Sequence, residues 1–205
     1  MNLPVFFWLA LWRSFDRCTH EPLIRFHFFG ENMLPRSTFV LGGAASGKSE
    51  WAERLLEKHF ATITYLATGQ VFDAEVEKRV EIHKNRRDQR WKTVEAPFDL
   101  APALASLTSD DAVLIDCATM WLTNHLLAEK DLQTAQSDLV QAMRKTAAHW
   151  VIVSNEVGQG IVPENTLSRS FREAQGRLNI ALAAEADLAV QIVAGLPIVL
   201  KGHLP

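Results

Sequence analysis

The segment from Gly42 to Ser49, which reads GGAASGKS, constrains this chain more than any other feature. It fits the pattern Gly, four variable residues, Gly, Lys and Ser, and it lies between the apolar run Thr38–Leu41 and a run compatible with a helix. Glycines let the backbone curl so that successive N–H groups point at phosphate oxygens, and the helix adds the positive end of its dipole. The segment therefore predicts a nucleotide phosphate site made of Gly42, Gly43, Ala44, Ala45, Ser46, Gly47, Lys48 and Ser49.

Two side chains of this loop have predicted chemical roles, and a third lies further along the chain. Lys48 supplies a mobile positive charge to the β- and γ-phosphates, and the Ser49 hydroxyl is placed to bind Mg²⁺. A second Mg²⁺ ligand is expected at the end of a buried strand, where Asp116 follows the apolar run Ala112–Ile115. The alternative is that Asp116 only caps the next helix. ATP or GTP is the expected nucleotide.

Short apolar runs alternate with longer helical patterns from Thr38 onward. Most of these runs are continuously apolar, as in strands covered on both faces, and they are Thr38–Leu41, Thr62–Ala67, Ala112–Asp116, Trp150–Ser154, Leu188–Val193 and Ile198–Lys201. Helical stretches separate the first five, which predicts a mostly parallel sheet flanked by helices, as in RecA-like P-loop NTPases. One such helix is residues 167–185, with Asn165 or Thr166 as its cap. The short link before the last run predicts an antiparallel edge hairpin.

The first 34 residues do not follow this pattern. Residues 3–12 are strongly apolar, but this run is about half of the roughly 20 residues that a membrane-spanning helix needs. It has neither a basic segment before it nor a small-residue cleavage site after it. We therefore expect residues 1–34 to be an extension, either a disordered tail or the result of a start placed upstream of Met33, rather than a membrane anchor. Residues 35–205 are expected to form one domain.

Charge and cysteine content narrow the class of protein further. The formal net charge of -3 gives no bulk attraction to nucleic acid or to anionic lipid, so neither is an expected partner. The two cysteines, Cys18 and Cys117, lie far apart and have no metal-binding spacing. Cys117 follows an apolar run and is expected to be a buried, reduced thiol. These features favour the reducing cytoplasm.

Residues 73–90 read as a helix that begins at Asp73. Its apolar positions continue at helical spacing into His83 and Arg87, and Lys84 and Arg86 flank them. Cations beside a histidine disfavour the imidazolium form, and a neutral ring can attack phosphorus. The alternative is a solvated helix end whose basic residues complement the helix dipole.

The class of nucleotide enzyme follows partly by exclusion. The chain lacks the Asn-Lys-x-Asp motif with which GTPase switches recognise guanine. It is also shorter than most RecA-type motors and transporters. A small kinase or a nucleotidyltransferase remains.

A longer set of motifs resembles the bifunctional adenosylcobinamide kinase / adenosylcobinamide-phosphate guanylyltransferase family. The resemblance spans about Thr38 to Lys201, and the run NEVGQGIVPEN that begins at Asn155 is its most specific part. The other matching positions occur in the same order: the loop at Gly42–Ser49, Tyr65–Thr68, Arg79 with His83, Trp91 with Glu95, Asp116, Arg169, Phe171, Arg172, Gly176 and Asn179. The chain departs from the family pattern at Ala45, where many members carry Arg, and at Gly69, where many carry Ser or Glu.

This resemblance implies an enzyme of cobalamin biosynthesis with two reactions. A nucleoside triphosphate phosphorylates adenosylcobinamide, and GMP from GTP then passes through His83 to the corrinoid phosphate, which gives adenosyl-GDP-cobinamide. The implied catalytic residues are His83 and Lys48, and the implied partners are adenosylcobinamide, nucleotides and further copies of the chain in a homotrimer. The resemblance places these residues at the nucleotide site: Ala67, Thr68, Gly69, Lys84, Asn85, Arg86, Arg87, Glu95 and Asp116.

The sequence alone leaves several alternatives open. Glu95 lies in a Thr-Val-Glu-Ala-Pro stretch that is expected to end a strand. It contacts guanine or ribose, or it is an ordinary surface carboxylate. Asn155 and Glu156 end the strand beside the Asp116 strand, where α/β sheets place ligand groups, although Glu156 also fits a purely structural cap. A small-molecule kinase without the guanylyltransferase step and a non-catalytic nucleotide sensor are the two rival functions.

Overall fold

The computed structural model describes residues 34–70 and 87–205, which belong to one compact unit, Asn32–Pro205. The predicted extension falls almost entirely outside the described residues, as does most of the predicted helix 73–90.

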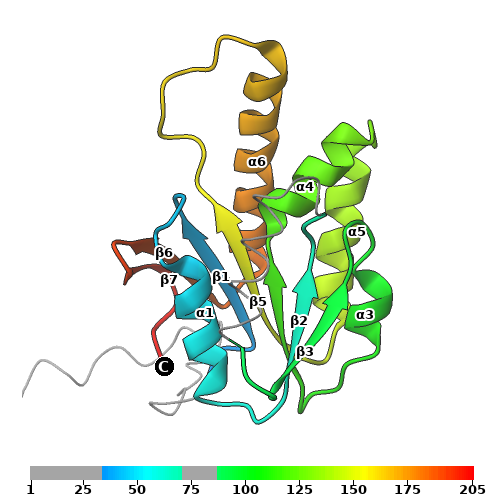
Figure 1. Ribbon diagram of the computed structural model, residues 1–205, viewed down its shortest axis with the longest axis vertical. Helices are drawn as coiled ribbons and strands as arrows, with labels where there is room; N and C mark the ends of the chain where they lie inside the picture. Colours follow the sequence, from blue (N-terminus) through cyan, green and yellow to red (C-terminus); the bar gives the residue numbers. More distant parts are fainter. Residues whose placement is uncertain (1–33, 71–86) are drawn as a thin grey trace, which may run out of the picture. The chain divides into compact units, whose positions relative to one another are not determined.

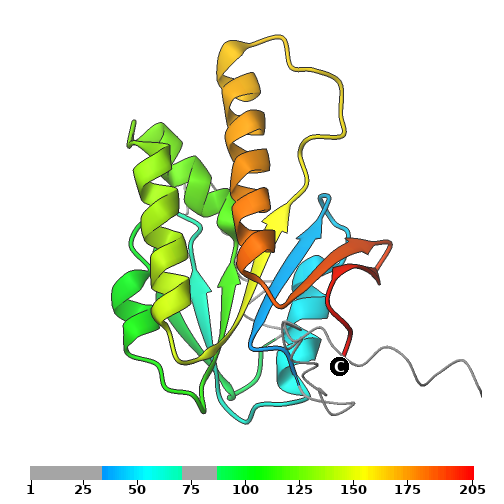
Figure 2. The same cartoon turned by 180° about the vertical axis from the view of Figure 1, so that it is seen from behind.

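These ranges form a seven-stranded sheet flanked by helices on both faces, as Figures 1 and 2 show from opposite sides. The strands are β1 Ser37–Gly42, β2 Ile63–Ala67, β3 Trp91–Glu95, β4 Ala112–Asp116, β5 His149–Asn155, β6 Leu188–Val193 and β7 Leu196–Lys201. The helices are α1 Lys48–Glu57, α3 Ala101–Ala105, α4 Ala118–Leu127, α5 Leu132–Lys145 and α6 Thr166–Glu185. The spatial order of the strands is β3-β2-β4-β5-β1-β6-β7.

The helices divide between the faces because neighbouring strand residues point to opposite sides. In Figure 1, α1 lies in front of the sheet, and Figure 2 shows α3, α4, α5 and α6 on the other side. Phe39 of β1 packs in the cluster that contains Trp121 of α4, whereas the next residue, Val40, packs with Leu56 of α1. Both faces of the central strands are therefore buried, which is why those strands are continuously apolar.

The predicted parallel sheet and edge hairpin are confirmed. All pairs from β1 to β6 are parallel, and only β6 and β7 pair antiparallel. The hairpin turn is tighter than predicted: Ala194 and Gly195 take φ values of 51° and 79°, and β7 therefore begins at Leu196 rather than Ile198. Positive φ at both turn positions matches the turn type that joins twisted antiparallel strands.

One strand was absent from the predicted set. β3 pairs only with β2 and is largely exposed, so it lacks the continuous apolar run that marked the other strands. Only the expectation that a strand ends at Glu95 pointed to it, and that expectation is confirmed.

The end of the predicted helix 73–90 is wrong. Residues 87–90 are not helical: the Asp88 carboxylate accepts the backbone N–H of Arg90 at 2.9 Å, and the Asp88 carbonyl accepts the N–H of Trp91 at 3.2 Å. This turn leads the chain directly into β3. The local side-chain bond of Asp88 and the parallel pairing of Trp91 with Ile63 outweigh the helical pattern.

The helices α5 and α6 begin at residues whose side chains cap them. Asn165, one of the two predicted caps of α6, accepts the backbone N–H of Ser168 at 2.7 Å, and Asp131 accepts that of Thr134 at 2.7 Å at the start of α5. In the described ranges, every helix is too short or too polar to cross a membrane.

Two glycines are expected to respond in opposite ways to replacement by alanine. Gly202 has a φ of 77°, and an added Cβ would lie 2.3 Å from the Asp187 carbonyl oxygen, so Gly202→Ala should lower the free energy of unfolding by at least about 1–2 kcal/mol. Gly176 lies inside α6 with no atom within 4 Å of an added Cβ, so Gly176→Ala should raise it by about 0.5–1 kcal/mol. Urea unfolding of both variants measures this, and changes of the same sign would contradict the structure.

Candidate active site

The predicted phosphate loop connects β1 to α1. Gly42 is the last residue of β1, and Lys48 and Ser49 are the first two residues of α1. The residue before the helix, Gly47, has a φ of 88°, and no side chain caps the helix start. The N–H groups of the first turn are therefore left for an external acceptor, and a phosphate fits both their geometry and the helix dipole.

The hairpin turn supports the loop from one side. The Gly195 N–H donates to the Ser46 carbonyl at 2.9 Å, and a Cβ on Gly47 would lie only 3.2 Å from the Gly195 Cα. In a trans peptide the carbonyl and the next N–H point in opposite directions. The bond to Gly195 thus turns the Gly47 N–H away from the hairpin.

A cavity of about 480 Å³ opens beside the loop. This volume is within the range of about 300–1,000 Å³ that is usual for small-molecule sites. Its lining comes from the loop, from the segment after β5 and from the end of β6: Gly43, Ala44, Ala45, Ser46, Glu156, Val157, Gln159, Gly160, Gln191, Ile192, Val193 and Ala194.

Lys48 lies against the loop. Its Nζ donates to the Gly43 carbonyl at 3.1 Å. Partial burial lowers the pKa of Lys48 below its ordinary value, and the nearby Cys117 and Asp116 oppose that shift. Because Asp116 interacts electrostatically with Lys48, the charged groups of β4 and of the phosphate loop lie close together.

Asp116 ends β4 as predicted, and it does not cap the following helix. The cap of α4 is Cys117, whose sulfur accepts the Met120 N–H at 3.5 Å, so the capping alternative for Asp116 is wrong. The Asp116 carboxylate and the Ser49 hydroxyl are hard oxygen donors, and a nucleotide adds phosphate oxygens beside them. This donor set fits Mg²⁺, which prefers a few protein oxygens together with phosphates and water.

Thr68 has a structural role at this edge of the sheet. Its buried hydroxyl donates to the Cys117 carbonyl and accepts the Cys117 N–H, both at 2.7 Å, and its own carbonyl accepts the Asn124 side chain. These bonds hold β2 to the end of β4 and fix the backbone next to Asp116. Of its predicted neighbours, Ala67 pairs with Asp116 in the sheet, and Gly69 follows with open space around it.

The described contacts of Glu95 and Arg87 are with β2 and α1. Glu95 is exposed and pairs with Ala67 at the end of β3. The Arg87 Nε donates to Glu53 of α1 at 3.2 Å, and the guanidinium stacks on Tyr65 with its central carbon 3.2 Å from the ring centroid. Arg87 therefore fastens the chain before β3 to α1. The predicted site residues His83, Lys84, Asn85 and Arg86 lie outside the described residues.

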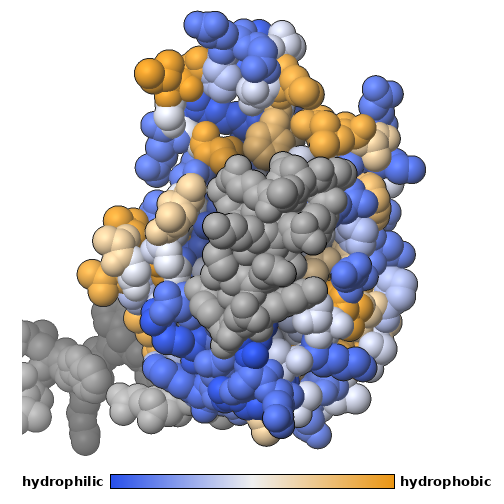
Figure 3. Space-filling model, in the orientation of Figure 1, coloured by the Kyte–Doolittle hydropathy of each residue, from blue (hydrophilic) through white to orange (hydrophobic). Residues whose placement is uncertain are grey.

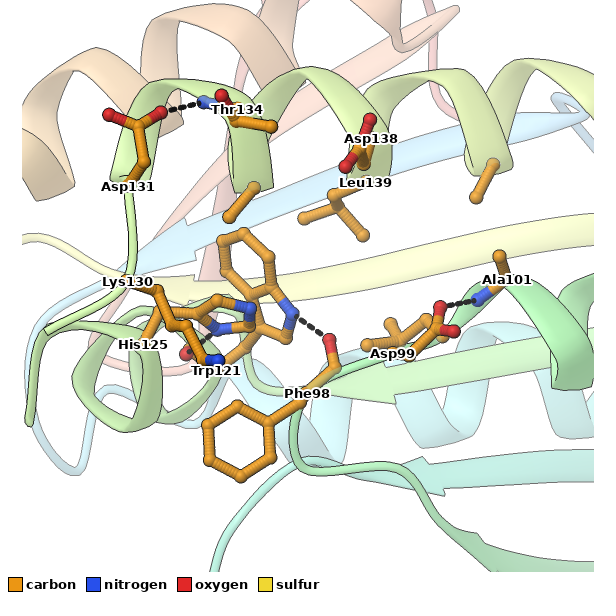
Figure 4. Close-up of a pocket in the computed structure, with 13 residues that line it drawn as sticks. Phe98, Asp99, Ala101, Trp121, His125, Lys130, Asp131, Thr134, Asp138 and Leu139 are labelled. Carbon is orange, nitrogen blue, oxygen red and sulfur yellow. Dashed lines mark hydrogen bonds between the residues drawn. The ribbon is translucent and has the colours of Figure 1, made fainter. Parts of the chain in front are cut away.

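A second cavity, of about 570 Å³, lies between α3, α4 and α5 (Figure 4). His125 packs on Trp121 with ring centroids 4.2 Å apart, and the Trp121 indole donates to the Phe98 carbonyl at 2.7 Å. None of the predicted site residues in the described ranges lines this cavity. Of its carboxylates Asp99, Asp131 and Asp138, Asp131 caps α5 and Asp99 accepts the N–H of Ala101 at the start of α3.

A phosphate loop at the carboxyl edge of a mostly parallel sheet defines a P-loop nucleotide-binding protein. The fold agrees with a solved structure, the prototypical ATPase from the type III secretion system of pathogenic bacteria. It matches with a TM-score of 0.51 and 11% identity over 80% of this chain and 57% of that chain. At this identity the likeness concerns the fold alone.

The particular family follows from the sequence comparisons. Residues 38–200 match the model described as cobinamide kinase / cobinamide phosphate guanyltransferase, and the chain belongs to this family. It is 39% identical over 167 residues to the bifunctional adenosylcobalamin biosynthesis protein CobP of Pseudomonas aeruginosa, covering 80% of this chain and 96% of that protein. It is 40% identical over 178 residues to the bifunctional adenosylcobalamin biosynthesis protein CobU of Salmonella typhimurium, covering 79% and 98% respectively. The predicted family is confirmed.

Cys117 is buried as predicted and should make stability depend on pH. Burial, followed by the nearby Asp116 charge, raises the pKa of the Cys117 thiol from 9.0 to about 11. The thiol therefore ionises more readily in the unfolded state than in the folded state. The free energy of unfolding is unaffected below about pH 9 and falls between pH 9 and about pH 11, by up to about 1.4 kcal/mol per pH unit. Cys117→Ser removes this titration and keeps a capping oxygen. Urea unfolding of both proteins at about pH 8 and about pH 10 checks this. If the free energy of unfolding changes equally with pH in the two proteins, the effect does not come from Cys117. The other cysteine, Cys18, is present in both proteins and cannot account for a difference between them.

Proposed function

We propose that this protein catalyses two successive transfers in cobalamin biosynthesis. It phosphorylates adenosylcobinamide with ATP or GTP, and it then transfers GMP from GTP to the corrinoid phosphate to give adenosyl-GDP-cobinamide. The observation that carries the proposal is the family match over residues 38–200 together with a complete phosphate loop that opens on a cavity.

In the first reaction the chain binds and orients the nucleotide. The free N–H groups at the start of α1 face the phosphates, and Lys48 neutralises the charge that grows on them during transfer. Ser49 and Asp116 would hold Mg²⁺, which offsets phosphate charge when bound. Lys48 now donates to the Gly43 carbonyl, so it must exchange that bond for a phosphate oxygen.

In the second reaction His83 is the proposed nucleophile, by family resemblance. Its neutral imidazole nitrogen attacks the α-phosphorus of GTP, a nitrogen–phosphorus bond forms, and pyrophosphate leaves. An oxygen of the corrinoid phosphate then attacks the same phosphorus and releases the imidazole. A covalent intermediate divides one difficult displacement into two easier ones.

The cellular location and the oligomeric state of the enzyme are part of the same proposal. We infer a cytoplasmic homotrimer. Surface available for self-association includes the exposed apolar side chains Leu196, Ile198 and Leu200 of β7 and Ile161 and Val162 of the segment before α6. Figure 3 shows apolar residues over the β6–β7 hairpin and on the upper part of the molecule.

Replacing Lys48 should remove the kinase activity without unfolding the protein. Lys48→Ala deletes one charge from a partly solvated site, and the loss of such a charge contact costs about 10²–10³ in rate. Transfer of the γ-phosphate to adenosylcobinamide is the measurement, and Lys58→Ala, at the exposed far end of α1, is the matched control. A near-normal rate in Lys48→Ala would show that the loop is not the catalytic site.

The guanylylated residue can be located by mass. Incubation with GTP and Mg²⁺ should add the mass of one GMP, which mild acid removes because a phosphoramidate of histidine is acid-labile. The adduct should be absent in His83→Ala and present in the control His59→Ala, whose histidine is exposed at the end of α1. An adduct that persists in His83→Ala would refute the assigned nucleophile. Intact phosphorylation of adenosylcobinamide with no adduct in the unmodified protein would favour the simple kinase.

A further inference from the structure

The last residue of β5 and the residue after it are held firmly beside the phosphate loop. The Asn155 N–H donates to the Thr119 hydroxyl at 2.9 Å, and its carbonyl accepts the Asn179 side chain at 3.2 Å. The next N–H, that of Glu156, donates to the Gly42 carbonyl at 3.0 Å. Three consecutive backbone groups are thus bonded, and they place the Glu156 backbone beside the first residue of the loop.

A buried polar network between the end of β5 and α6 fixes this arrangement from the other side. Ser154 donates to Asn179 at 2.6 Å, and Gln175 donates to both Ser154 and Asn179 at 2.9 Å. Ser154 and Gln175 are fully buried. Such a network is costly to disturb, so it fixes one arrangement of the end of β5 against α6.

Glu156 is the only ionisable side chain among the described residues that line the loop cavity. The basic side chains that reach this segment come from α6 and bind its backbone: Arg172 donates to the carbonyls of Gly158, Gly160 and Ile161, and Arg169 donates to that of Pro163. The Glu156 carboxylate accepts the Gly158 N–H, and it has no ion-pair partner among the described residues.

A lone carboxylate beside a triphosphate site weakens nucleotide binding through charge repulsion. A turn-capping role does not require this charge, because a glutamine oxygen would accept the Gly158 N–H equally well. The basicity of the carboxylate is the property that only Glu supplies here. A hydroxyl that attacks a phosphate needs an acceptor for its proton, and a positioned carboxylate is a usual one.

We propose that Glu156 is the general base of the kinase step and that its wall of the cavity, from Glu156 to Gly160, receives the acceptor hydroxyl. The hydroxyl oxygen bonds to the γ-phosphorus, the bond from that phosphorus to the bridging oxygen breaks, and the nucleoside diphosphate leaves. The hydroxyl proton passes to the Glu156 carboxylate. This inference rests on the proposed function. It assigns no role to Glu156 in GMP transfer, where a neutral imidazole has no proton to lose before attack.

The test is Glu156→Gln, which keeps the acceptor for the Gly158 N–H and removes the base. The kcat for phosphorylation of adenosylcobinamide should fall about 10²–10⁴-fold. The nucleotide Kd should stay equal or become tighter, and the melting temperature and the amount of GMP adduct should not change. Glu164→Gln, an exposed carboxylate of the same segment that does not line the cavity, is the matched control and should behave as the unmodified protein.

A second variant separates a base from a structural group. Glu156→Ala loses the carboxylate and the turn bond together, and added formate should restore part of its kcat if the missing function is proton acceptance. A Glu156→Gln rate within a few-fold of the control, or a Glu156→Ala protein that formate leaves unchanged, would overturn the assignment while the proposed function stands. Absence of any phosphate transfer by the unmodified protein would overturn both.

Discussion

The backbone at Gly47 takes a left-handed conformation between β1 and α1, and the rest of the site depends on it. With φ at 88° and only 3.2 Å between an added Cβ and the Gly195 Cα, any side chain at this position would be strained. The turn starts α1 without a side-chain cap and leaves its first N–H groups for an anion. It also brings the Ser46 carbonyl to the hairpin, so the last two strands of the chain support the loop.

The parallel sheet then gathers the remaining groups at one edge. Parallel strands end on the same side, and β1, β4 and β5 are neighbours or next neighbours in the sheet. Gly42, Asp116 and Asn155 end these three strands, although they are far apart in the sequence. Thr68 and Thr119 contribute through their bonds to the backbone, since each fixes the end of a strand rather than presenting a hydroxyl to the cavity.

Local patterns predicted most of this fold. The strands buried on both faces were found because their apolar runs are continuous, and the phosphate loop was found because its spacing is set by backbone geometry. β3 was missed because an edge strand buries little, and the helix predicted over residues 73–90 ended wrongly because the Asp88 turn and sheet pairing prevail there.

The site was predicted less completely, because its other parts depend on contacts between distant segments. The pairing of Arg87 with Glu53, and the approach of the hairpin to Ser46, span many residues and leave no periodic signal. Glu156 was visible as a polar residue at a strand end, but its position in the loop cavity required the register of β5 against β1. Family resemblance supplied His83, which no spacing argument could separate from an ordinary surface histidine.

A single labelling experiment tests whether one protein carries out both transfers. GTP labelled at its α-phosphate is given to the protein with Mg²⁺, free nucleotide is removed, and adenosylcobinamide phosphate is added. Label should first remain with the protein and then appear in the corrinoid product in equal amount. Label that never joins the protein, or that stays on it after the corrinoid phosphate is added, would rule out transfer through a protein-bound GMP.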